Sequence, residues 1–154
     1  MANIAEVKDI VLNEIDRQWS QAKQSEDQRA TLSNFIVLIA VAAQGYIIDK
    51  DFPKRALVVA VVLMCLGLFG VVATAKYYER FRMSMTRVGR LREKLDGLFP
   101  DLKLDVTEAL ADRRHHSRYP YLSAVRLHLL WRAIMGSIFA LGAYDLYVIL
   151  EYGH

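Results

Sequence analysis

Residues 56–75 read ALVVAVVLMCLGLFGVVATA, a run of twenty positions without a charged residue, a proline or a side-chain amide. An α-helix rises about 1.5 Å per residue, so this run is about as long as the hydrocarbon core of a bilayer is thick. The run therefore predicts a membrane-spanning helix. It makes the chain an integral membrane protein, although its 154 residues are 24% charged as well as 54% hydrophobic.

Two further runs are long enough to span a bilayer. Residues 30–48 carry no charge, and residues 133–150 are interrupted only by Asp145. One acid near the centre of a span costs about 3 kcal/mol on an insertion scale, which the Leu, Ile, Phe and Val residues of this third run can offset. The first two spans are joined by residues 49–55, which include Pro53. A connection this short predicts an antiparallel helical hairpin.

The distribution of Lys and Arg predicts the orientation of the spans. Residues 76–132 carry thirteen Lys or Arg and seven Asp or Glu, a net charge of +6. Basic segments between spans stay on the cytoplasmic side. The N-terminus should therefore be cytoplasmic, and the 49–55 loop and the C-terminus should lie outside. The first 29 residues carry ten charges and no apolar core, so they do not form a secretory signal.

Two apolar stripes at steps of three or four residues predict helices on either side of the hairpin. One runs through residues 4–22 and the other through residues 81–98, where Phe99-Pro100 ends the pattern. The stripes should pack on each other or on other subunits. The candidate residues for this oligomer or partner interface are Val11, Ile15, Val88, Leu91 and Leu95.

The expected fold is an all-α membrane protein with three transmembrane helices, the first two a hairpin, and cytoplasmic helical arms. Its parts are an amphipathic cytoplasmic helix at 1–29, the hairpin at 30–75, a basic cytoplasmic region at 76–132 and the third span at 133–150. Within the basic region, Asp105 and Glu108 read as a capping box that opens a short helix. Residues 121–150 could form one long helix that ends with the third span.

Three polar residues in the spans are candidates for a pore or for contacts between subunits. Asp145 could line a pore, accept protons or pair with another subunit, because an acid at membrane depth is a functional hypothesis by default. The alternative places it at the outer headgroup boundary, facing water. Asn34 and Gln44, ten residues apart, should lie roughly on one face of the first span. Their amides could join helices or line an aqueous path.

A basic helix follows the second span. Its cationic residues suit contacts with anionic lipid or with a ligand, and they include Arg80, Arg82, Arg87, Arg90 and Arg92. Nucleic acid and nucleotides are not favoured as partners, because the chain has no stacking motif and no glycine-rich phosphate loop.

The sequence predicts no enzyme. It contains no Ser/His/Asp set, no paired-carboxylate constellation and no HExxH motif, so no catalytic residue is assigned. The single Cys65 excludes a disulfide within the chain. His115 and His116 are adjacent, so on a helix they point about 100° apart and are poorly placed to share a metal. No metal site and no cofactor are expected.

The layout of residues 3–99 resembles the SLATT-type small membrane proteins of bacterial conflict and antiviral systems. The resemblance is carried by the hairpin turn at 49–55 and the aromatic and basic exit AKYYERF at 75–81, and the third span departs from the two-span plan. It implies a pore-forming effector in the bacterial inner membrane that works beside a sensor.

The expected function is therefore that of a membrane effector of a bacterial defence system. Such a protein would oligomerise in the lipid bilayer and perturb or permeabilise the inner membrane when a cytoplasmic sensor or enzyme triggers it. Two alternatives stay open: a non-catalytic anchor or accessory subunit of a larger complex, and a small housekeeping channel or transporter.

Overall fold

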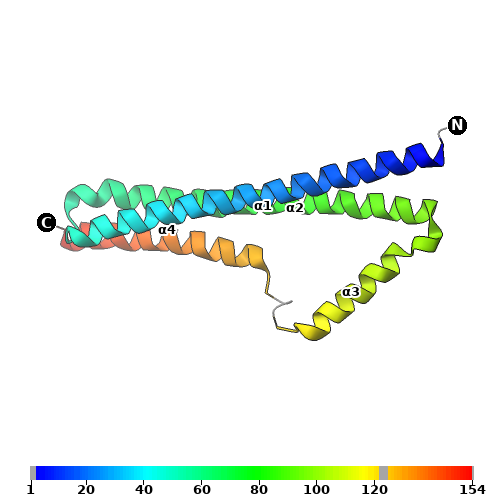
Figure 1. The fold of residues 1–154 in the computed structure, drawn as a ribbon. Helices are drawn as coiled ribbons and strands as arrows, with labels where there is room; N and C mark the ends of the chain where they lie inside the picture. Colours follow the sequence, from blue (N-terminus) through cyan, green and yellow to red (C-terminus); the bar gives the residue numbers. More distant parts are fainter. Residues whose placement is uncertain (1–2, 122–124, 154) are drawn as a thin grey trace. The chain divides into compact units, whose positions relative to one another are not determined.

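The computed structural model describes residues 3–121 and 125–153, and this described part consists of helices and short connections, without strands. The long elements are α1 (Ile4–Asp49), α2 (Leu57–Leu98), α3 (Leu104–Arg118) and α4 (Leu127–Tyr152), with the short 3-10 turns η1 (Lys54–Ala56) and η2 (Pro100–Leu102) between them (Figure 1). The chain divides into two units. The membrane unit is Asp27–Tyr78 with Leu127–His154, and the arm unit is Met1–Glu26 with Glu79–Arg126.

Three helical runs are long and apolar enough to cross a membrane: Ile4–Asp49, Lys54–Leu98 and Leu127–Tyr152. This confirms the predicted all-α membrane fold. The first two runs extend well beyond the apolar stretches, because no proline or glycine break separates the spans from the charged arms. Each arm is thus the direct continuation of a span.

The hairpin turn is tight. After α1, Asp51 and Phe52 both adopt the left-handed conformation, each with φ of 53°. Their backbone amides donate to the last carbonyls of α1, with Asp51 N at 3.1 Å from the oxygen of Ile48 and Phe52 N at 3.1 Å from that of Ile47. Pro53 then adopts an extended conformation and η1 starts the second span. The described turn thereby reverses the chain as the sequence predicted.

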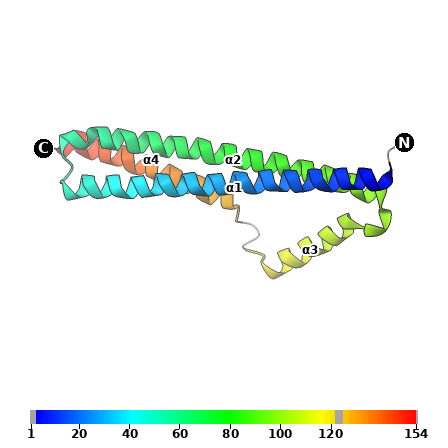
Figure 2. The ribbon, with the colours of Figure 1, turned by 45° about the horizontal axis from the view of Figure 1, so that its top comes forward.

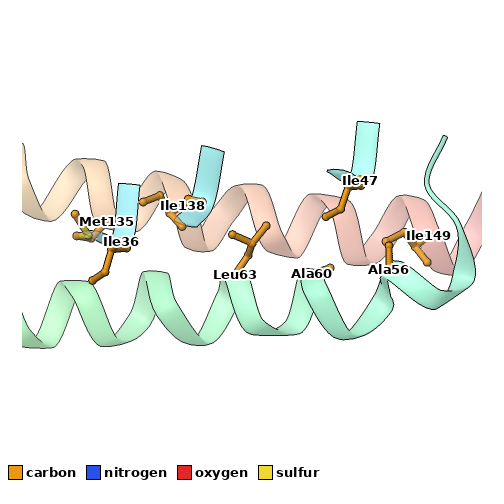
Figure 3. Close-up of a cluster of buried hydrophobic side chains, with 9 residues drawn as sticks. Ile36, Ile47, Ala56, Ala60, Leu63, Met135, Ile138 and Ile149 are labelled. Carbon is orange, nitrogen blue, oxygen red and sulfur yellow. The ribbon is translucent and has the colours of Figure 1, made fainter. Parts of the chain in front are cut away.

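The core of the membrane unit is formed by α1, α2 and α4, which lie side by side in this unit (Figures 1 and 2). All three helices contribute to one cluster of buried apolar side chains. Figure 3 shows eight labelled members of this cluster: Ile36 and Ile47 from α1, Ala56, Ala60 and Leu63 from the second span, and Met135, Ile138 and Ile149 from α4. Helix α4 contacts η1, and a Cβ atom at Gly153, just after α4, would lie 3.1 Å from the carbonyl oxygen of Phe52 in the hairpin turn. The carboxyl end of α4 therefore lies at the turn, so α1 and α4 run in the same direction.

Buried positions on α2 and α4 recur every seven residues, the spacing of helices that pack along a continuous seam. On α4 the buried residues are Met135, Ile138, Gly142, Asp145 and Ile149. On α2 they include Ala60, Leu63, Gly67, Gly70 and Thr74, and the same register continues to Val88 and Leu95. The small residues on α2 let α4 approach closely. Asp145 is one of these buried positions, and it is the charged residue among the five buried residues of α4.

Two predicted helix starts are wrong. The last helix begins at Leu127, because Tyr121, Val125 and Arg126 are not helical, while residues 122–124 lie outside the described residues. The capping box at Asp105 and Glu108 does not form either. Helix α3 begins at Leu104 with Lys103 as its N-cap residue, two residues before the predicted N-cap Asp105, and its first amides are capped by Asp96 of α2.

Candidate functional site

Asp145 is fully enclosed by the membrane unit, with 0% of its surface exposed. It lies on the inner face of α4, between the apolar core positions Gly142 and Ile149. By helix rise it is about 10 Å from the end of α4 at Tyr152. The alternative that left Asp145 facing water at the headgroup boundary does not agree with this burial.

Gln44 of α1 is the partner of Asp145. Its Nε2 atom donates to Oδ1 of Asp145 at 3.1 Å, across 101 residues of sequence. The second carboxyl oxygen, Oδ2, and the amide oxygen of Gln44, Oε1, are both buried without a hydrogen-bond partner. The pair therefore makes one hydrogen bond and leaves two of its oxygens without a donor. One proton placed on the carboxyl group would supply the donor that these two oxygens lack.

The composition of the pair limits its chemistry. A neutral amide does not balance the charge of a carboxylate, and a buried charge requires a counter-charge, a proton or water. Buried apolar residues belong to the same two helices, Ile47 on α1 and Ile149 on α4. Among the described residues, no group of three or more His, Cys, Asp or Glu side chains could hold a metal ion. The site is suited to proton exchange or to polar contact with another helix.

Asn34 does not share the face of Gln44, which corrects the expected alignment. Gln44 is half-buried against α4, whereas Asn34 is exposed on the outside of α1. Ten residues turn an α-helix by about 80° short of three full turns, so the two amides point in different directions. Asn34 therefore presents an amide outward at membrane depth, where another helix could receive it.

The packing of α2 on α4 depends on glycine. A Cβ atom at Gly142 would lie 2.8 Å from the backbone nitrogen of Met64 and 2.9 Å from the carbonyl oxygen of Ala60. A Cβ atom at Gly67 would likewise lie 2.7 Å from the Cα atom of Phe139. The two backbones thus touch without intervening side chains, and this close contact fixes the height of Asp145 along the bundle.

A ring stack marks the other end of α4. Tyr78 of α2 and His128 of α4 stack with their ring centroids 3.9 Å apart and their planes 16° from parallel. Both residues belong to the membrane unit. The stack holds the first turn of α4 against α2.

The arm unit buries part of the predicted interface within one chain. Val11, Val88 and Leu95 are buried, while Ile15 and Leu91 are half-buried. Glu14 of α1 and Leu91 of α2 line one hollow, which places the two arms in contact. The stripes therefore pack on each other within one chain, which was the first of the two expected arrangements; the second was packing on other subunits.

The expected apolar stripe of the first arm is wrong at one position. Trp19 is 54% exposed, and its neighbour Gln18 is buried instead, with its side-chain amide donating to Glu14 at 2.8 Å. The buried positions of this arm are Val11, Gln18, Ala22 and Ser25, so two of the four are polar. A search for apolar periodicity overlooked this seam, whereas a search for small or neutral residues at seven-residue spacing would have found it.

Most of the basic run on α2 faces outward. Arg80, Arg82, Arg87 and Arg90 are exposed, and Arg90 pairs with Glu93 on its own helix at 3.1 Å. Arg92 differs, because its guanidinium pairs with Glu108 of α3. It is therefore occupied in joining α3 to α2 inside the arm unit.

Asp96 is a site residue that the sequence did not indicate. Its Oδ1 accepts from the amide of Leu104 at 3.0 Å and its Oδ2 accepts from that of Asp105 at 3.2 Å. The hydrogen bond from the Leu104 amide is the largest influence on this carboxyl, and it holds the pKa of Asp96 below its usual 3.8. The carboxylate acts as the N-terminal cap of a helix that follows it in sequence.

Comparison with known proteins supplies no identity, since no protein-family model, no curated protein and no solved structure matches this chain.

Proposed function

We propose that this chain is a non-catalytic membrane effector of a bacterial defence system, which self-associates in the inner membrane and makes it leak when a cytoplasmic partner triggers it. The bundle described above is the resting form. In this form, α4 packs on α1 and α2 of the same chain and Asp145 is buried between these helices. In the active form, α4 would move away from α1 and present Asp145 and Gln44 to neighbouring copies or to water.

The observation that carries this proposal is the half-satisfied pair of Asp145 and Gln44. An acid inside a span costs about 3 kcal/mol even on insertion scales, so it weakens a structure that serves only as an anchor. Two buried oxygens of this pair have no hydrogen-bond partner, so both could accept hydrogen bonds from water or from another copy in the active form. The outward amide of Asn34 offers a second polar contact for self-association, for roughly 1 kcal/mol.

The orientation of the spans belongs to the same proposal. With residues 76–132 in the cytoplasm, the arm unit is accessible to a sensor or enzyme. The turn at 49–55 and the end of α4 then lie outside, and Asp145 lies in the outer half of the membrane.

The test is the membrane potential of bacteria that express the chain from an inducible promoter, followed with a potential-sensitive dye. At high expression, chains meet often enough to self-associate without the trigger, so wild type should depolarise the cells as its amount rises. Asp145→Leu should keep the amount of inserted protein and abolish the depolarisation. Asp49→Asn removes an exposed acid at the end of α1 and should behave as wild type. If wild type leaves the potential unchanged at high expression, or if Asp145→Leu depolarises as strongly, the effector proposal fails.

A second candidate function is that of an anchor or accessory subunit, and one observation favours it. Leu12 and Trp19, seven residues apart on the first arm, both point outward and are 41% and 54% exposed. Tryptophan is over-represented at the centres of protein interfaces. Under this alternative, expression leaves the membrane potential intact, and Trp19→Ser releases a soluble partner without changing the amount of this chain.

A further inference from the structure

Helix α3 carries its acids on one face, and that face is turned toward α2. Asp105, Glu108 and Asp112 line the same hollow as Arg92 and Asp96 of α2. Glu108 pairs with Arg92, and the amide of Asp105 donates to Asp96. The negative charges of α3 are thus used inside the arm unit.

A second face of α3 has a different composition. Its residues follow helical spacing and line one hollow, and none of them is acidic: Thr107, Leu110, Ala111, Arg114, His115 and Arg118, with Tyr119 after the helix. No described residue of α3 is buried, and Leu110 is 61% exposed. The guanidinium of Arg118 lies 5.8 Å from the centre of the Tyr119 ring. This face combines cations, an aliphatic patch and an aromatic ring.

The chain from α3 into the membrane is also free of acids. Residues 113–132 contain five arginines and no Asp or Glu, and the apolar part of α4 follows directly. Eight residue steps separate Tyr119 from Leu127, so they are at most about 29 Å apart whatever the path between them. The end of α3 is therefore tethered within reach of the bilayer that α4 enters.

We propose that the Arg114 and Arg118 face of α3 binds the surface of a membrane that contains anionic phospholipids. The arginines contact lipid phosphates, while Leu110 and the Tyr119 ring lie at the level of the headgroups. Charge complementarity favours this partner, because juxtamembrane basic residues are attracted to anionic leaflets. The inference concerns a surface of the arm unit and does not depend on the effector function.

The test uses the full chain in lipid nanodiscs, with Cys65→Ser to remove the single native cysteine and Ala111→Cys to carry a nitroxide on the proposed face. Accessibility of the label to a water-soluble relaxation agent is measured in discs of phosphatidylcholine alone and with one quarter phosphatidylglycerol. The label should be protected only in the anionic discs, and 0.5 M salt should reverse the protection.

Two double variants separate this face from net charge. Arg114→Gln with Arg118→Gln should lower the ratio of surface-bound to free α3 by roughly thirtyfold. Arg17→Gln with Lys23→Gln removes the same charge from the exposed side of α1 and should leave the protection unchanged. Amide exchange of 107–118 in unlabelled protein repeats the measurement without the cysteine. Equal accessibility in both kinds of disc, or equal loss in the two double variants, overturns the proposal.

Discussion

Gly142→Ala tests the packing on which the buried acid depends. The added methyl would meet the Met64 nitrogen at 2.8 Å, the Ala60 oxygen at 2.9 Å and the Leu63 Cβ atom at 2.9 Å. Two of these are backbone atoms of α2 and cannot rotate away. To restore ordinary contact near 3.5 Å, α4 must retreat from α2 by about 0.7 Å. This retreat loosens the bundle around Asp145.

The expected destabilisation comes from two opposing effects. Overpacking of a close-packed site costs about 1–3 kcal/mol, because neighbouring atoms are forced apart. Replacing glycine by alanine inside a helix contributes about 1 kcal/mol in the favourable direction. Gly136→Ala isolates the second effect, since nothing lies within 4 Å of a Cβ atom at Gly136 on the same helix. The difference between the two variants should therefore be about 1–3 kcal/mol in favour of Gly136→Ala.

The assay is reversible unfolding of the purified chain in mild detergent, followed by far-UV circular dichroism. Gly142→Ala should unfold at a lower denaturant concentration than Gly136→Ala. Equal midpoints for the two variants would refute the reasoning, because they would show that α2 and α4 do not approach as closely as this structure has them.

Three other predictions concern separate parts of the chain. Gln44→Leu should destabilise the membrane unit more than Asp145→Leu, because it leaves the carboxyl group buried without its only described partner, and the same unfolding assay compares them. Asp96→Asn should speed amide exchange at the start of α3. In the wild type, the lowered pKa of Asp96 means that its stabilisation is fully present above pH 3.8 and is lost as the pH falls through the lower native value. The protection of these amides, corrected for their intrinsic exchange rate at each pH, should therefore decrease as the pH is lowered from 5 through the native pKa. An Asn variant whose protection has the same pH dependence would contradict the cap. A cysteine at Lys54 should be labelled from outside intact cells and one at Arg90 only after they are opened; the reverse pattern would invert the proposed orientation.

The sequence predicted the helices of this protein better than their contacts. Composition alone marks residues 56–75 as a span, because no water-soluble helix needs such a run. The continuity of α1 and α2 into the arms also follows from the sequence, since nothing in it interrupts either helix. The start of α3 could not be predicted locally. Its cap is supplied by Asp96 from the preceding helix, and a capping box is recognised only within one helix.

The candidate site was predicted in part. An acid in a span draws attention by itself, and Gln44 was selected as a polar residue in the first span. Their pairing depends on the heights at which α1 and α4 pack, which are set by glycine contacts such as that of Gly142 with Ala60 and Met64. The outward position of Trp19 and the burial of Gln18 also could not be predicted from the sequence. Hydrophobicity predicts which face of a helix is buried only when the seam itself is apolar.

The hydrogen bond between Gln44 and Asp145 has a consequence for the order of synthesis. Its two residues are 101 positions apart, and at about 5–20 residues per second the ribosome needs about 5–20 s to make the intervening chain. Once the second span has also been made, the hairpin can enter the membrane while the amide of Gln44 still has no carboxylate to bind. A newly made hairpin can therefore associate with another copy through the surface that α4 later covers. Synthesis rate is then a determinant of how many chains close on themselves and how many join a neighbour.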